Sequence, residues 1–228
     1  MKVVSVVSSI FVLFIVLRII VWGVRQFNEP DRSQSIGIRQ QVPFDQQLEI
    51  FRQLHFDLNP EVDSSDIASW ELDDGTAEEQ PFMLVYTLLG SCIEREPFTP
   101  ITNRCWSFDT EAIEDNGAYV DIIRNLERIS RGALTFTDVT DHVDIDAGDA
   151  WVSFVFNGQR YRWTMRVNDD WVDETLFENI VKLTIEHNTN GRITSLYTGD
   201  QTVMLGFETE ESLAEIKRAT GLPIEWLE

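Results

Sequence analysis

The chain begins with a long, uninterrupted apolar run. Residues 3–24 contain a single charged side chain, Arg18. A helix of these 22 residues would be about 33 Å long, enough to cross a hydrocarbon core of about 30 Å. It would also satisfy its own backbone hydrogen bonds, as lipid requires. The pattern predicts a single-pass transmembrane helix, with residues 1–27 as a membrane anchor.

The alternative to an anchor is a cleaved signal peptide, and the orientation of an anchor in the membrane is a separate question. A cleaved signal peptide would have an apolar region of only about 7–15 residues that ends in small residues. Here the run continues into Trp22. The positive charges that follow, Arg25, Arg32 and Arg39, favour a cytoplasmic globular part. The very short leading segment favours export instead, so the side of the membrane is undecided.

Weaker patterns follow the anchor. Residues 28–43 are polar, contain two prolines and predict a linker. Asp45 is placed to cap a short helix. The apolar positions of that helix recur at helical spacing: Leu48, Phe51 and Leu54. Residues 57–80 carry nine acidic side chains and few large apolar ones, so we assign 44–80 to a short helix and an acidic loop.

Residues 81–228 show strong patterns and predict the compact domain. The continuous apolar run 82–89 favours a strand buried on both faces. Two hairpins are indicated by the turn pairs Asn157-Gly158 and Gly199-Asp200. The other predicted strands are 105–108, 151–156, 160–167, 193–198, 202–207 and 224–227.

Three helices are predicted within the same domain. The first should begin at Asn116 or Gly117 and end at Gly132. The second should be capped by Asp173 or Asp170. Its inward residues should be Leu176, Phe177, Ile180, Val181 and Ile185. The last helix should span 210–219 with Thr209 as its cap. Helices and tight hairpins in this order predict an α+β fold, with about three helices packed on a mainly antiparallel sheet.

Charge narrows the classes of partner. The chain has 39 Asp and Glu residues against 18 Lys and Arg, a net charge of −21. Three basic residues lie in the first 27 positions, so residues 28–228 carry 15 − 39 = −24. This field repels polyanions and excludes a general nucleic-acid binder. A hydrophobic content of 43% with seven Trp is too apolar for a disordered acidic chain.

The densest acidic motif precedes the first hairpin. Its aspartates are Asp138, Asp141, Asp144, Asp146 and Asp149. Clusters of oxygen ligands with a glycine turn suit Ca²⁺, so a divalent-ion site is one interpretation and Ca²⁺ the one candidate cofactor. The EF-hand spacing fails, because Gly148 is at position five from Asp144 and Val155 at position twelve. Alternation of Asp with Val and Ile also fits a strand with one solvated face.

The other candidates are an arginine face and a cysteine pair. In the predicted strand 160–167, apolar residues alternate with Arg160, Arg162 and Arg166, which can bind an anion or a partner, or pair with nearby acids. Cys92 and Cys105 can form a disulfide in an oxidising compartment, or stay as two reduced thiols. The sequence contains no Gly-x-Ser-x-Gly motif, zinc-ligand spacing or glycine-rich phosphate loop.

These observations favour a binding protein over an enzyme. Charge, tether and the lack of catalytic motifs predict a membrane-tethered acidic protein-binding module, such as an inhibitor or immunity-type protein that masks a basic partner. The alternatives are a divalent-ion-dependent or hydrolytic enzyme centred on residues 138–149, and a structural subunit of a membrane complex. We expect contacts with a membrane through residues 3–24 and with a basic protein, but none with nucleic acid.

Overall fold

Two antiparallel sheets alternate with helices along one axis of the described chain. The computed structural model describes residues 42–63, 66–67 and 81–228, which belong to a compact unit that extends from Gln41 to Glu228. The helices are α2 (Phe44–Gln53), α5 (Met83–Leu89), α6 (Ala118–Ile129), α7 (Thr175–Glu186) and α8 (Glu210–Thr220). The strands are β1 (Cys105–Asp109), β2 (Phe136–Asp144), β3 (Asp149–Phe156), β4 (Gln159–Met165), β5 (Arg192–Tyr197), β6 (Thr202–Glu208) and β7 (Glu225–Trp226).

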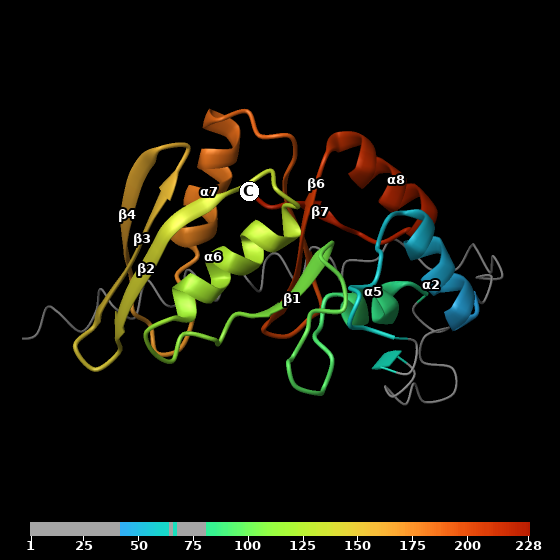
Figure 1. Ribbon diagram of the computed structural model, residues 1–228, viewed down its shortest axis with the longest axis horizontal. Coiled ribbons are helices and arrows are strands. Elements are labelled where there is room, and N and C mark those ends of the chain that lie inside the picture. Colours follow the sequence, from blue (N-terminus) through green and yellow to red (C-terminus); the bar gives the residue numbers. More distant parts are fainter. Residues whose placement is uncertain (1–41, 64–65, 68–80) are drawn as a thin grey trace, which may run out of the picture. The chain divides into compact units, whose positions relative to one another are not determined.

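The elements form four layers (Figure 1). A three-stranded sheet in the order β2-β3-β4 is followed by α6 and α7, then by a four-stranded sheet in the order β1-β6-β5-β7, and finally by α2, α5 and α8. Every named strand pair is antiparallel. The predicted α+β class with antiparallel sheets is therefore confirmed. The division into two sheets was not predicted.

Two hydrophobic cores lie on opposite faces of the four-stranded sheet. Val203, Leu205 and Phe207 of β6 face the core that contains α6, α7 and the three-stranded sheet. Met204 of β6 faces the core of α2, α5 and α8. A strand with alternate residues in two cores has no solvated face, which explains the continuous apolar sequence of β6.

The predicted Asn157-Gly158 turn and the predicted Thr209 cap are confirmed. Asn157 and Gly158 both have positive φ, as a two-residue hairpin turn requires, and Phe156 pairs with Gln159 across it. The Thr209 hydroxyl accepts a hydrogen bond from the Ser212 amide at the start of α8. The β5–β6 hairpin and the short edge strand β7 also lie where the sequence placed them.

The structure corrects the prediction for residues 82–89. The segment is helix α5, preceded by Phe82 with φ of 70°, and not a strand. A short apolar run buried on several sides has no periodicity that separates the two structures. Tyr86 of α5 stacks on Phe51 of α2 with ring centroids 5.9 Å apart, so α2 shares the core of α5.

Two smaller predictions also need correction. Ile185, predicted to face inward on α7, is 57% exposed. Asp45 lies within the first turn of α2 and makes no capping hydrogen bond; the cap position is Pro43. The strand indicated by the alternation of Asp with Val is present: residues 136–144 form β2.

Residues 1–41, 64–65 and 68–80 are not described. The predicted anchor at 1–27, nearly all of the predicted linker and most of the acidic loop fall among them. Within the described ranges, the helices are all too short or too polar to cross a membrane.

A carboxylate from β2 caps helix α6. Gly117, with φ of 106°, is the cap residue, and its amide and those of Tyr119 and Val120 donate to Asp141 at 2.9–3.2 Å. The first amides of a helix lack intrahelical partners and carry partial positive charge, so a carboxylate there is stabilising. Asp141 therefore links the three-stranded sheet to the helix layer.

We expect Asp141→Asn to lower the free energy of unfolding by about 1–2 kcal/mol, because the amide keeps the size but loses the charge and one acceptor oxygen. Asp146→Asn is the matched control, since it removes the same charge from an exposed position of the same hairpin. Urea denaturation followed by circular dichroism measures both. Equal losses in the two variants would contradict the capping role.

Candidate functional site

The five predicted aspartates do not converge. Asp141 binds the start of α6, Asp138 pairs with Arg160 at 2.7 Å, and Asp144 accepts the amide of Ala147. Asp149 lies 3.8 Å from His142, and Asp146 is exposed. Across the described ranges, no three His, Cys, Asp or Glu side chains are grouped to hold a metal ion.

A bulge in β2 is the reason for this dispersal. The strand register shifts between Thr137 and Thr140, where Asp138 has φ of 52°. Phe136 faces the core before the bulge, and Val139 and Val143 face it afterwards. Since an inserted residue changes which positions face inward, Asp141 points to α6 instead of solvent.

Four acidic segments meet at one end of the molecule. They are residues 109–117, 144–149, 168–174 and 198–202, and none contains Lys or Arg. The backbone joins them: Thr110 donates to Gln201 at 3.1 Å, Val172 donates to Thr110 at 2.9 Å, and Ile113 donates to Asp170 at 2.9 Å. The Val143 amide donates to Asn116 at 2.8 Å, which brings the β2–β3 hairpin to the same end.

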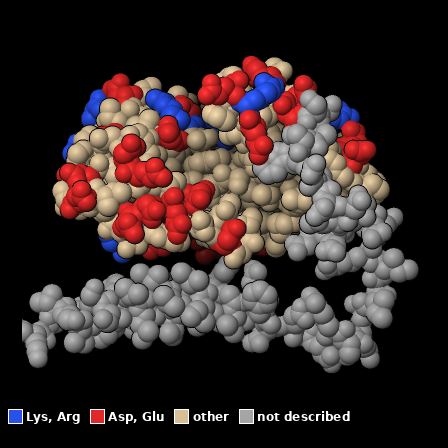
Figure 2. All heavy atoms as spheres, turned by 90° about the horizontal axis from the view of Figure 1, so that it is seen from below, with Lys and Arg blue, Asp and Glu red and all other residues tan. Residues whose placement is uncertain are grey.

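We call this surface the acidic end. Its exposed or half-buried carboxylates are Asp109, Glu111, Glu114, Asp115, Asp144, Asp146, Asp149, Asp169, Asp170, Glu174 and Asp200. Asp173, in the same segments, is buried. Figure 2 views the molecule from below, where Asp and Glu side chains gather over this region. The arrangement produces a strongly negative surface from segments up to 90 residues apart in sequence.

An aromatic side chain lies within the acidic end. Trp171 is 40% exposed and follows directly after Asp169 and Asp170. Its amide donates to the Asn168 carbonyl at 3.2 Å, which fixes a tight turn beneath it. A large, partly exposed aromatic ring surrounded by charge is typical of an anchor at a protein interface.

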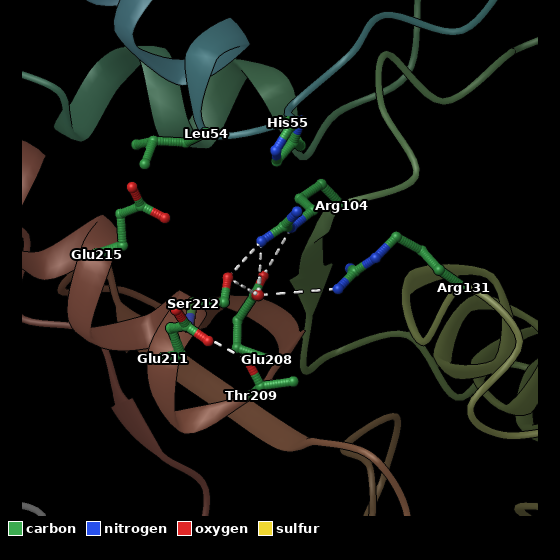
Figure 3. A pocket seen from close by; sticks show the side chains of 9 residues that line it. All are labelled: Leu54, His55, Arg104, Arg131, Glu208, Thr209, Glu211, Ser212 and Glu215. Atoms are coloured by element: carbon green, nitrogen blue, oxygen red, sulfur yellow. Dashed lines mark hydrogen bonds and ion pairs between the residues drawn. The ribbon is translucent and has the colours of Figure 1, made fainter.

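A second candidate is a pocket of about 270 Å³ beside the start of α8. Leu54 and His55 lie across it from Thr209 and Glu211, and Arg104 and Arg131 project into it (Figure 3). Charged groups of both signs therefore converge in this hollow.

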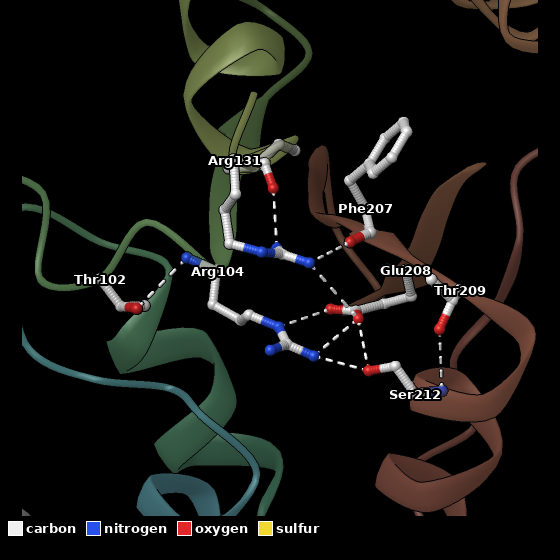
Figure 4. A network of polar contacts seen from close by, with 8 residues as sticks. Thr102, Arg104, Arg131, Phe207, Glu208, Thr209 and Ser212 are labelled. Carbon is white, nitrogen blue, oxygen red and sulfur yellow. Dashed lines mark hydrogen bonds and ion pairs between the residues drawn. The ribbon is translucent and has the colours of Figure 1, made fainter. Parts of the chain in front are cut away.

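Charges of opposite sign pair at the base of this pocket (Figure 4). Arg104 and Glu208 are only 8% and 3% exposed, and Arg104 donates Nε and Nη2 to the two carboxylate oxygens at 2.9 and 2.7 Å. The Ser212 hydroxyl donates to Glu208 at 2.7 Å, and Arg131 lies 3.7 Å from the same carboxylate. Burial, and then the neighbouring Arg104, lower the pKa of Arg131.

This cluster is better suited to structure than to catalysis. Glu208 already occupies the position that an anionic ligand would take between the two guanidinium groups. The Ser212 hydroxyl donates to Glu208 at 2.7 Å and accepts from Arg104 at 2.6 Å, so its hydrogen bonds are made within the cluster. Its members come from before β1, after α6, the end of β6 and the start of α8, so no local motif in the sequence indicated it. The only signal was an acid at the end of the apolar strand β6.

The three predicted arginines lie on β4 and directly after its end. Arg160, Arg162 and Arg166 are all exposed, on the side of the strand opposite the core residues Tyr161, Trp163 and Met165. The Arg162 guanidinium carbon lies 3.7 Å from the centroid of the Trp151 ring, a cation–π contact. Arg160 pairs with Asp138, as noted above.

The two cysteines are free thiols in the structure. Cys105 is fully buried in β1 and Cys92 is exposed. Burial raises the pKa of the Cys105 thiol well above its ordinary value.

Comparison with known proteins gives no match to a family model, a curated protein or a solved structure. The function must therefore be inferred from the chemistry of the acidic end and the polar cluster themselves.

We expect Glu208→Gln to lower the free energy of unfolding by about 3–5 kcal/mol, because it leaves the buried Arg104 without its counter-charge. Glu215→Gln is the matched control. Glu215 lines the same pocket but is exposed, so this substitution should lower the free energy of unfolding by less than about 1 kcal/mol. Urea denaturation measures both, and a loss below about 1 kcal/mol for Glu208→Gln would remove the structural role of the cluster.

Thiol labelling separates the two cysteines. Under non-reducing conditions, we expect a maleimide to modify Cys92 in the folded chain and Cys105 only after unfolding in denaturant, because the second thiol is buried and its pKa is raised. Mass spectrometry counts the labels. Failure to label either cysteine in denaturant would indicate a disulfide, contrary to the structure.

Proposed function

We propose that the protein is a membrane-tethered acidic module that binds a basic protein surface through its acidic end. The observation that carries this proposal is the meeting of four segments without Lys or Arg around the exposed Trp171. A negative surface of this kind repels phosphates and attracts Lys and Arg side chains.

Electrostatics and Trp171 would have separate roles in such a contact. The negative field would accelerate encounter with a basic surface by about 10- to 1,000-fold and reject acidic competitors. The Trp171 ring would supply apolar area at the centre of the contact, where aromatic anchors contribute most of the binding free energy. The carboxylates would then form the polar rim.

The tether supports a partner located at the membrane. An anchor at residues 3–24 would confine the domain near that surface, and the linker at 28–43 would let it turn toward a neighbour. An inhibitor or immunity-type protein that masks a cationic protein meets all these requirements. It also needs no catalytic group, in agreement with the saturated Arg104–Glu208 cluster.

Affinity capture with the full-length tagged chain, from native membranes in mild detergent, tests the proposal. We expect a basic protein to be recovered at about 50 mM salt and largely lost at about 500 mM, because exposed charges are screened. Neutralising three carboxylates of the acidic end (Glu114→Gln, Asp146→Asn and Asp169→Asn) should abolish recovery. Trp171→Ala should weaken binding about 30-fold, the loss of roughly 2 kcal/mol typical of an anchor residue.

The matched control neutralises three exposed carboxylates elsewhere: Asp57→Asn, Glu61→Gln and Glu186→Gln. It changes the net charge equally and should retain the partner. A partner that binds independently of salt, or that the control loses as completely as the acidic-end variant, would refute a site at the acidic end. Recovery of no partner would count against the function as a whole.

A further inference from the structure

Strand β4 forms an open edge of the three-stranded sheet. It pairs with β3 on one side only and lies outermost in Figure 1. In residues 42–63, 66–67 and 81–228, no backbone hydrogen bond reaches residues 159–165 from the other side. An unpaired strand of this kind presents amides and carbonyls that another extended segment can complete.

The side chains that face outward along this edge are basic. Arg160, Arg162 and Arg166 occupy alternate positions with Thr164. The Arg162 guanidinium contacts the Trp151 ring, and within the described structure the guanidinium groups of Arg162 and Arg166 form no ion pair, although the Arg166 backbone amide donates to Asp173 at 2.6 Å. Most other described Lys and Arg side chains are ion-paired, as expected where acids outnumber bases about two to one. Two exposed guanidinium groups without an ion pair, Arg162 on β4 and Arg166 directly after it, are therefore a local exception.

We propose that β4 binds an extended acidic segment of a partner protein, which adds to the sheet as a further strand. The seven residues of β4 span about 24 Å, enough to pair with a segment of similar length. Since alternate residues of a strand face the same side, carboxylates at every second position of that segment would face the arginines. Main-chain hydrogen bonds would supply affinity, and the arginines would select acidic sequences.

A second copy of this chain is a poor occupant of the edge. Antiparallel pairing of two β4 strands would bring two rows of arginines together, and like charges directly opposite one another are destabilising. Each copy also carries a net charge of −21, which opposes association. The rival interpretation is that the arginines only protect an open edge from pairing with anything.

A peptide titration of the full-length chain tests the proposal, independently of the acidic end. The probe is a labelled seven-residue peptide in which Glu alternates with Val and Thr. We expect fluorescence polarisation to report binding, and amide NMR signals of β4 to shift. The same peptide with Lys for Glu should not bind. N-methylation of the amides that would face β4 should abolish binding, because pairing needs those donors.

Two variants identify the surface. Arg162→Thr with Arg166→Thr should weaken binding about fivefold or more while retaining strand propensity, and Arg218→Thr on α8 should leave it unchanged. The proposal fails if the acidic peptide does not bind, if the Lys peptide binds equally, or if the arginine variant binds as wild type. It also fails if the wild type does not bind the peptide and the arginine variant self-associates. In that case the arginines would only protect the edge from pairing.

Discussion

The four-stranded sheet has no solvated face, and this constraint determines the layers around it. Strand β6 places Val203, Leu205 and Phe207 in one core and Met204 in the other, so each face must be covered. Helices α6 and α7 cover one face, and α2, α5 and α8 cover the other (Figure 1). Helix α6 is amphipathic, and its buried stripe of Tyr119, Ile122, Ile123, Leu126 and Ile129 lies in the core that it shares with the three-stranded sheet and β6. Most charged residues of the chain must therefore lie in loops, at sheet edges or on outer faces.

The buried polar cluster follows from the same constraint. Strand β6 ends in Glu208, whose carboxylate lies almost entirely out of water. A buried charge is tolerated only when it is paired and hydrogen-bonded, and Arg104, Arg131 and Ser212 meet that need. These residues belong to segments on both sides of the sheet. The ion pair therefore fixes how the end of β6, the start of α8 and the residues before β1 meet.

The sequence predicted those features that depend on neighbouring residues. Asn157-Gly158 and Thr209 act through the backbone within three positions, so hairpin and cap could be recognised without the rest of the fold. The segment 82–89 could not, because its apolar run fits a buried helix as well as a buried strand. The bulge at Asp138 carries no signal in the alternation of Asp with Val. Arg104 and Glu208 are 104 positions apart, and only the assembled sheet brings them together. The acidic end shares this origin: each of its four segments is an ordinary turn, and their convergence is a property of the topology.

The two proposed contact surfaces differ in how far their charges act. At physiological salt the screening length is about 8 Å, so the field of the acidic end reaches a basic partner before contact. The same net charge repels an acidic segment at that distance, and the arginines of β4 become effective only when the segment lies on the strand. Attraction at the acidic end therefore governs which partner arrives, whereas at β4 the backbone hydrogen bonds must hold a segment that the overall field does not favour. The arginines there would favour acidic over basic segments among those already close to the sheet. Only guanidinium groups without an internal ion pair can do this, so the number of arginines is less important than their freedom from such pairs.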